Sequence, residues 1–367
     1  MDFHRTPVLI FWETTRACPL ACIHCRASAL SDPLPGEMNT HEAMRFMDSI
    51  LEFEEPRPTL IFTGGDPLKR KDLFLLLEYA KKRGIRTGLS PAVSELLTSN
   101  VFEKVKELNV SSVSISLDAP VANLHDEIRR RQGTFVRTIE SIRLALSLGI
   151  NIQVNTVVMR HNFSLLPEIF HLIKEIGVKT WEVFFLVRVG RGIDVEDITP
   201  EEYESACNFL YDASMYDVVI RTVEAPFIRR VARVRAEKGE YWTGRDYVQM
   251  REKLLKYEGP PTSNSTIATR GTLDGDGIIF VGYDGSVYPG GLLPYMLGSV
   301  KEQKIARIYR ESETLRRIRE RELKGYCGIC EYKSICGGSR ARAYSFTADP
   351  LESDPACIQV SAIARQN

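Results

Sequence analysis

The sequence predicts an α/β fold, in which a partial (β/α)6 barrel of the TIM type precedes a small C-terminal α+β domain. Six short β-rich runs alternate with helical segments, about one strand every 25–50 residues, which is typical of parallel βαβ units. Six units are too few to close an eight-stranded barrel. After about residue 220 the alternation ends, and a hairpin pattern and clustered cysteines follow.

The predicted strands are followed by segments whose apolar residues recur at helical spacing. The strands cover residues 8–12, 59–62, 85–89, 112–117, 150–158 and 180–187. Helices are predicted over 40–53, 72–83 and 134–148, the last with Phe135, Ile139 and Ile142 on one face. Thr199 and Pro200 form an N-cap and a first-turn proline, so another helix begins there. The active face of such a sheet lies at the C-terminal ends of its strands.

The pattern after residue 220 divides the rest of the chain. A basic helix is predicted over 227–238, a linker over 257–264, a β-hairpin from 278–281 and 286–288, and a helix over about 305–323. We therefore expect a core domain over 1–220, a connecting segment over 221–269 and a small domain over 270–367. The basic run is expected to be a solvated helix face or, alternatively, a patch for a propionate-bearing or phosphate-bearing substrate.

Composition excludes several classes of protein. The chain has 48 Lys and Arg against 48 Asp and Glu, which argues against a nucleic-acid binder. Its 44% hydrophobic and 26% charged residues are typical of a soluble globular protein. No apolar run approaches the ~20 residues of a membrane span, and the first run, 8–12, is too short for a signal peptide. A cytoplasmic location is expected.

Seven of the eight cysteines fall into two sets, which suggests two metal sites in a reducing compartment. The first set is Cys18, Cys22 and Cys25; the second is Cys327, Cys330, Cys336 and Cys357; Cys207 stands alone and is expected to be buried packing. Three thiolates can hold three irons of a [4Fe–4S] cubane and leave the fourth iron open, whereas four thiolates close a site. Zinc is the alternative at both sets, with His24 as a possible added ligand at the first.

The first cysteine set resembles the signature of the radical S-adenosylmethionine (SAM) superfamily, C-x3-C-x-φ-C after the first strand. His24 takes the φ position, which in that family lies beside the adenine. The glycine pair Gly64 and Gly65 with Asp66 matches the second family motif, and the resemblance implies that they address the SAM amino group. Asp66 stands where glutamate is commoner.

Polar residues near other predicted strands match further family positions. The resemblance implies that Ser116, Arg129 and Asn155 bind the SAM carboxylate and ribose, although each could also be an ordinary strand-end or capping residue. It also implies reductive cleavage of SAM to methionine and a 5′-deoxyadenosyl radical, which abstracts a substrate hydrogen. The cofactor supplies that chemistry, and the protein supplies orientation and solvent exclusion.

The second cysteine set, C-x2-C-x5-C with a distant fourth cysteine, is similar to the outer auxiliary cluster of SPASM-domain radical SAM enzymes. A zinc ribbon has comparable spacing. With four ligands the resemblance implies one closed auxiliary [4Fe–4S] cluster, suited to electron relay or structural support.

Segments along nearly the whole chain resemble radical SAM enzymes of siroheme-dependent haem biosynthesis, in particular Fe-coproporphyrin III decarboxylases. They are residues 11–18, 25–27, 184–187, 190–192 and 336–344. The haem-forming enzymes carry further cysteines near the positions of Glu224, Thr272, Gly290 and Ser339, and none is a cysteine here. The inner auxiliary cluster is therefore expected to be missing, as in twitch-type enzymes, and its space to hold substrate or packed side chains.

Three residues remain as candidates for contact with substrate. Glu224 could accept a proton or pair with an arginine, and Arg188 and Arg191 end the sixth predicted strand at the expected cavity mouth.

The resemblance implies an oxidoreductase or lyase that modifies a tetrapyrrole, with an electron donor such as ferredoxin or flavodoxin. The alternatives are a maturase of a peptide or a pterin-type metal cofactor, and a non-catalytic iron–sulfur scaffold or carrier.

Overall fold

The computed structural model describes residues 2–364, whose strands form one mixed sheet in the order β11-β10-β9-β1-β2-β3-β4-β5-β6-β7, with β8 beside β9. Strands β1 to β7 and β9 run parallel, and β10 and β11 are antiparallel to their neighbours. The barrel strands are β1 (Leu9–Glu13), β2 (Thr59–Thr63), β3 (Thr87–Leu89), β4 (Ser112–Ser116), β5 (Ile152–Val158), β6 (Thr180–Phe185) and β7 (Val219–Val223). The C-terminal strands are β8 (Leu273–Asp274), β9 (Gly277–Val281), β10 (Ser286–Tyr288) and β11 (Gly298–Ser299).

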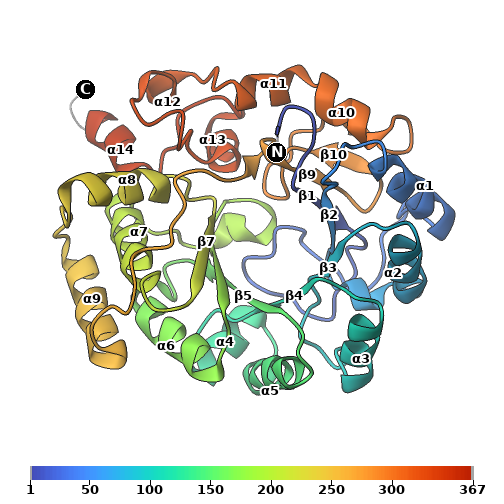
Figure 1. Ribbon diagram of the computed structural model, residues 1–367, viewed down its shortest axis with the longest axis horizontal. Helices are drawn as coiled ribbons and strands as arrows, with labels where there is room; N and C mark the ends of the chain where they lie inside the picture. Colours follow the sequence, from blue (N-terminus) through green and yellow to red (C-terminus); the bar gives the residue numbers. More distant parts are fainter. Residues whose placement is uncertain (1, 365–367) are drawn as a thin grey trace.

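Helices cover the outer face of the curved sheet (Figure 1). Around the barrel these are α1 (Thr40–Ile50), α2 (Leu73–Lys82), α3 (Ser99–Glu107), α4 (Ala122–Arg129), α5 (Thr134–Ser147), α6 (Leu166–Ile176) and α7 (Pro200–Ala213). The others are α8 (Ile228–Lys238), α9 (Arg245–Glu258), α10 (Ile305–Glu311), α11 (Glu313–Arg319), α12 (Gly325–Ile329), α13 (Arg340–Thr347) and α14 (Ile358–Ala364). No helix within residues 2–364 combines the length and apolar character needed to cross a membrane.

Strand β5 illustrates how the sequence separates core from barrel interior. Its residues alternate between buried and half-buried, and the buried Ile152 and Val154 belong to the main hydrophobic core beneath the helices. The intervening Gln153 and Asn155 face the interior. The strand ends at Val158, as the sequence predicts, and Asn155 lies at its centre.

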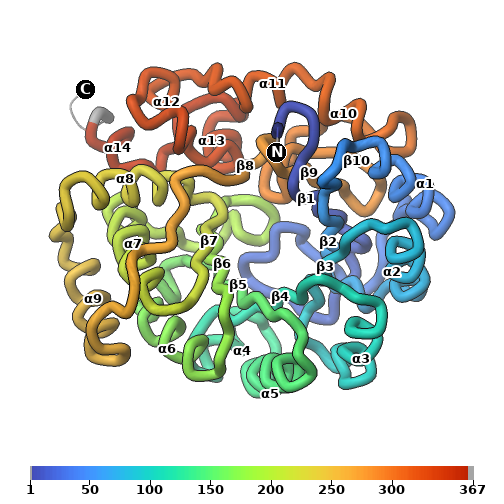
Figure 2. The backbone as a smooth tube through the Cα atoms, viewed as in Figure 1, coloured from blue at the N-terminus to red at the C-terminus, as the bar shows by residue number. Residues whose placement is uncertain are grey.

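The sheet passes the boundary expected at residue 220. Strand β7 pairs with β6 across that point, and β9 pairs in parallel with β1, so the C-terminal region extends the barrel sheet. Figure 2 shows the chain returning from α9 across the molecule to β8 and β9, beside β1. The expected hairpin is confirmed as β9–β10. The helix expected over 305–323 is two helices, because Ser312 caps the second by accepting from the Leu315 N–H.

Candidate active site

The first cysteine set lies in a loop at the C-terminal end of β1, as the sequence predicts. Backbone hydrogen bonds close this loop: the Cys18 N–H donates to the Leu30 carbonyl at 2.7 Å, and the Leu30 N–H donates to the Arg16 carbonyl at 3.1 Å. Cys18 and Cys22 are buried, and Cys25 is half-buried. One short loop therefore presents three thiols at the mouth of the barrel.

The segment after β6 also holds the cysteine loop in place, through hydrogen bonds to its backbone. Arg191 donates from Nε to the Cys22 carbonyl and from Nη1 to the Ala29 carbonyl, both at 2.9 Å. Gly190 has φ +55°, and a Cβ there would lie 2.3 Å from the Arg26 carbonyl oxygen, so only glycine fits. Arg191, expected at the substrate, thus contacts the cysteine loop, whereas Arg188 is exposed and donates to the Ile193 carbonyl.

A buried ionic chain leads from the cysteine loop to the end of β4. Arg129 donates to the Cys22 Sγ at 3.6 Å and pairs with Asp118 at 2.5 Å, and His24 Nε2 lies 3.8 Å from the same carboxylate. Burial raises the pKa of Asp118, but Arg129, His24, His125 and the Val157 N–H together outweigh burial and hold this pKa below its usual range. Burial lowers the pKa of His24 to about 4, which keeps its imidazole neutral. Asp118 is a site residue that the sequence analysis passed over.

The glycine pair packs against the chain just before Cys18. A Cβ on Gly64 would lie 2.5 Å from the Thr15 carbonyl oxygen, and one on Gly65 would lie 2.4 Å from that of Ala17. Asp66 is fully buried and accepts from the Leu68 and Ala92 N–H groups and the Ser94 hydroxyl, at 3.1–3.3 Å. Burial raises its pKa to about 6. The motif positions the cysteine loop, and its contact with SAM stays a prediction.

A row of polar side chains lines the barrel interior beside the cysteine loop. Ser116 on β4 is the register partner of Asn155 on β5, so these two candidate SAM contacts lie on neighbouring strands. Gln153 Nε2 donates to Asn155 Oδ1 at 2.9 Å and to Glu182 Oε2 at 2.8 Å. The sequence analysis missed Gln153 and Glu182, although both stand at alternate, inward positions of predicted strands.

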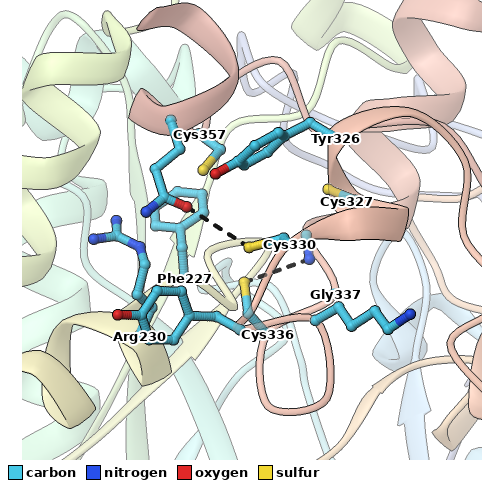
Figure 3. Close-up of a pocket in the computed structure, with 12 residues that line it drawn as sticks. Phe227, Arg230, Tyr326, Cys327, Cys330, Cys336, Gly337 and Cys357 are labelled. Atoms are coloured by element: carbon cyan, nitrogen blue, oxygen red, sulfur yellow. Dashed lines mark hydrogen bonds between the residues drawn. The ribbon is translucent and has the colours of Figure 1, made fainter. Parts of the chain in front are cut away.

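The second cysteine set converges from three segments of the C-terminal region. Figure 3 shows Cys327, Cys330, Cys336 and Cys357 around one pocket, which Phe227 and Arg230 of the α8 region also line. The Asp354 N–H donates to the Cys327 Sγ and the Gly338 N–H to the Cys336 Sγ, both at 3.5 Å. The chain therefore brings together four thiols that lie up to 30 positions apart in the sequence.

Burial shapes the chemistry of both thiol sets. It raises the pKa of Cys18 and of Cys336 to about 12, and that of Cys357 to about 11. Free thiolates are disfavoured in such places, whereas a bound metal centre replaces the thiol proton. Cys207 is fully buried within α7, as expected for packing.

Three of the four arginines of the basic helix α8 are buried or half-buried, which corrects the expectation of a solvated basic face. Arg230 forms a buried ion pair with Glu204 of α7, with Nη1 3.1 Å from Oε1. Arg229 donates to the Ile335 and Thr272 carbonyls at 3.2 and 2.7 Å, which ties α8 to the C-terminal region. Among the four arginines of α8, Arg233 is the exposed one, and it forms an ion pair with Glu237.

The region where haem-forming enzymes carry the cysteines of an inner cluster contains a pair of buried carboxyl groups here, Glu224 and Asp274. Glu224 is buried and accepts from the Ser339 hydroxyl, and the buried carboxyl group of Asp274 lies beside it. A Cβ on Gly290 would lie 1.9 Å from Asp274 Oδ1. Packed side chains therefore fill this space. Glu224 contacts a hydroxyl and lies beside a second acid, and the positive charge of Arg342 partly offsets the rise in its pKa caused by burial.

We predict that this carboxyl pair makes stability depend on pH. Burial, reinforced by the partner charge, raises the pKa of Asp274 well above its usual value, and burial raises that of Glu224. Acids with raised folded-state pKa values lose stability as pH rises from about 4, their unfolded value, through the folded values. Glu224→Gln should therefore flatten the fall in the free energy of unfolding between pH 5 and pH 8, measured by urea unfolding.

The exposed α5 residue Glu140 offers the control, because Glu140→Gln should leave the pH profile of wild type unchanged. A Glu224→Gln profile as steep as that of the wild type would contradict the raised pKa values of this carboxyl pair.

Comparisons with known proteins agree with this geometry. A model of the Radical SAM superfamily matches residues 12–173. The AdoMet-dependent heme synthase of Methanosarcina barkeri is 36% identical over 96% of this chain and 97% of its own length. The Fe-coproporphyrin III synthase of the same organism is 28% identical over 96% of this chain and 88% of its own. The solved structure "Native anSMEcpe with bound AdoMet" has a TM-score of 0.70 at 18% identity, over 96% of this chain and 94% of that one, and shows the shared fold.

A parallel partial barrel with three thiols beside the end of its first strand defines an enzyme of the radical SAM class. The chain belongs to the radical SAM superfamily and is a relative of its AdoMet-dependent heme synthases. The sequence-based predictions of fold class and of a radical SAM enzyme are thereby confirmed. Membership implies a [4Fe–4S] cluster and SAM.

Proposed function

We propose that the chain holds its SAM-binding [4Fe–4S] cluster at Cys18, Cys22 and Cys25 and modifies a tetrapyrrole. The arrangement of these thiols carries the proposal: they share one braced loop at the barrel mouth, and Arg129 donates to one of them. We infer the substrate class from the relatives, whose names specify heme and Fe-coproporphyrin III.

When bound, the cluster and SAM supply the one-electron chemistry. The chain's own residues hold and enclose that centre. Arg129 offsets negative charge at the Cys22 sulfur and remains paired with Asp118. We assign SAM contacts to His24, Gly64, Gly65, Asp66, Ser116, Arg129 and Asn155.

We further propose one closed auxiliary [4Fe–4S] cluster at Cys327, Cys330, Cys336 and Cys357. The Arg230 guanidinium beside this pocket suits a centre of net negative charge. The cluster serves electron relay or support, and a ferredoxin or flavodoxin supplies the electrons.

One variant tests both proposals. The wild type, reconstituted anaerobically, should carry about eight irons per chain, four for each cluster. With dithionite, SAM and Fe-coproporphyrin III it should form 5′-deoxyadenosine and change the mass of the tetrapyrrole. The double variant Cys327→Ala, Cys330→Ala should carry about four irons and still form 5′-deoxyadenosine, but leave the tetrapyrrole unchanged.

Cys207→Ala is the matched control, because it removes a buried cysteine outside both sets and should keep the full iron content. Stoichiometric zinc in the wild type would show that the C-terminal set is a zinc site. An unchanged tetrapyrrole despite SAM cleavage by the wild type would contradict the substrate class, and no SAM cleavage with any reductant would favour a scaffold.

A further inference from the structure

A cavity of about 290 Å³ lies between the end of β1 and the β9–β10 hairpin, directly beside the cysteine loop. Two arginines that flank this loop line it: Arg16, two residues before Cys18, and Arg26, immediately after Cys25. Neither Arg188 nor Arg191 is among the described residues that line this space.

The two arginines share one buried carboxylate. Glu13, at the end of β1, accepts from Arg26 Nη1 at 3.1 Å through Oε1 and from Arg16 Nε at 3.2 Å through Oε2. The Glu13 side chain is 1% exposed, whereas those of Arg16 and Arg26 are 37% and 22% exposed. Each arginine uses one N–H group to bind Glu13, and both arginines line the cavity, so their other N–H groups are available to a ligand there.

Aromatic rings on the hairpin complete this wall. The Arg26 guanidinium lies over the Phe280 ring at 4.5 Å, and that of Arg16 lies over the Tyr283 ring at 4.9 Å. Stacking fixes the plane of each guanidinium and leaves its N–H fork free for hydrogen bonds. Tyr288 is a third ring in the lining.

Charge in the cavity is unevenly placed. Two guanidiniums face one carboxylate, Glu13, so this wall carries one excess positive charge. The other acid of the lining, Asp284, lies in the β9–β10 turn, where Oδ1 accepts from the Ser286 N–H at 3.0 Å. The planar donor fork of arginine matches a carboxylate through two parallel hydrogen bonds.

We propose that Arg16 and Arg26 bind carboxylate arms of the substrate, while Phe280 and Tyr283 contact the edge of its conjugated ring. This inference rests on the proposed tetrapyrrole substrate, because propionate arms on a flat macrocycle supply both features. Ligand pockets usually measure about 300–1,000 Å³. A cavity of 290 Å³ therefore holds one edge of the macrocycle, with the rest directed toward the barrel interior.

The test is an absorbance titration of the reconstituted full-length protein with Fe-coproporphyrin III in the presence of SAM. Arg26→Gln and Arg16→Gln should each raise Kd about tenfold or more, because each replaces a charged fork with a shorter, neutral polar side chain. The wild-type Kd should rise with ionic strength, and this rise should be smaller in the double variant. Iron content checks that both clusters remain in each variant.

Arg45→Gln, on the exposed face of α1, is the matched control and should bind as the wild type does. Wild-type affinity and salt dependence in the double variant would overturn the inference and leave the proposed function standing. A wild type that cleaves SAM but does not bind Fe-coproporphyrin III would overturn the substrate class and this inference together.

Discussion

Replacing Cys18, Cys22 and Cys25 together with alanine should reduce SAM cleavage to background while about four irons stay bound at the C-terminal set. The expected loss is complete because the three thiols come from one loop, and no other cysteine lies in this part of the chain. The measurements are 5′-deoxyadenosine formation with dithionite and iron content per chain.

The triple variant should fold, since backbone and arginine contacts hold the loop. The hydrogen bonds between Cys18 and Leu30, and those from Arg191 to carbonyl oxygens, do not use the thiols. Circular dichroism checks this point. SAM cleavage retained by the triple variant would contradict the assignment of the cluster, and loss of all iron would show that the two sites are not independent.

Asp118→Asn should give the largest loss of stability among single substitutions at the site, about 3 kcal/mol. The variant keeps the size of the side chain but removes the charge that offsets Arg129, whose guanidinium is then left buried without its ionic partner. The partner charge holds the pKa of Asp118 down, so its stabilisation is present above the unfolded pKa of about 4 and is lost as pH falls through the lower folded value.

Anaerobic urea unfolding at pH 7 and pH 3 measures this effect. The difference between wild type and Asp118→Asn should be large at pH 7 and smaller at pH 3. The exposed pair of Arg5 and Glu54 supplies the control, because Glu54→Gln removes a solvent-screened charge and should leave stability within error of the wild type. An Asp118→Asn variant as stable as the wild type would contradict the role of the buried pair.

Local patterns were sufficient to predict the barrel and both cysteine sets. The β-rich run over 150–158 and the helix start at Thr199 and Pro200 depend on residues close together in the sequence, and the structure confirms both. Clustered thiols are equally local in sequence. These features needed no knowledge of how distant segments meet.

Residues whose role depends on distant partners were missed or misplaced. Arg191 looks like a cavity residue from its strand end, yet its partners are carbonyl groups 162 and 169 positions earlier. Asp274 and Glu224 are 50 positions apart in the sequence, and Asp274 lies near Glu224 because β8 pairs with β9. Arg16 and Arg26 belong to segments that match a family motif. The cavity beside them is formed together with residues of the distant β9–β10 hairpin, so the local sequence does not indicate it.

The addition of β9 to β1 has a consequence for electron transfer. Four residues of β9, Ile278–Val281, are in register with Leu9–Trp12, and the cysteine loop begins shortly after that pairing ends. The C-terminal region, whose later segments carry the second thiol set, thus joins the sheet whose first strand leads into the first set. Electrons passing between the two centres would cross a fixed gap through packed protein, at a rate set by distance and driving force rather than by domain motion.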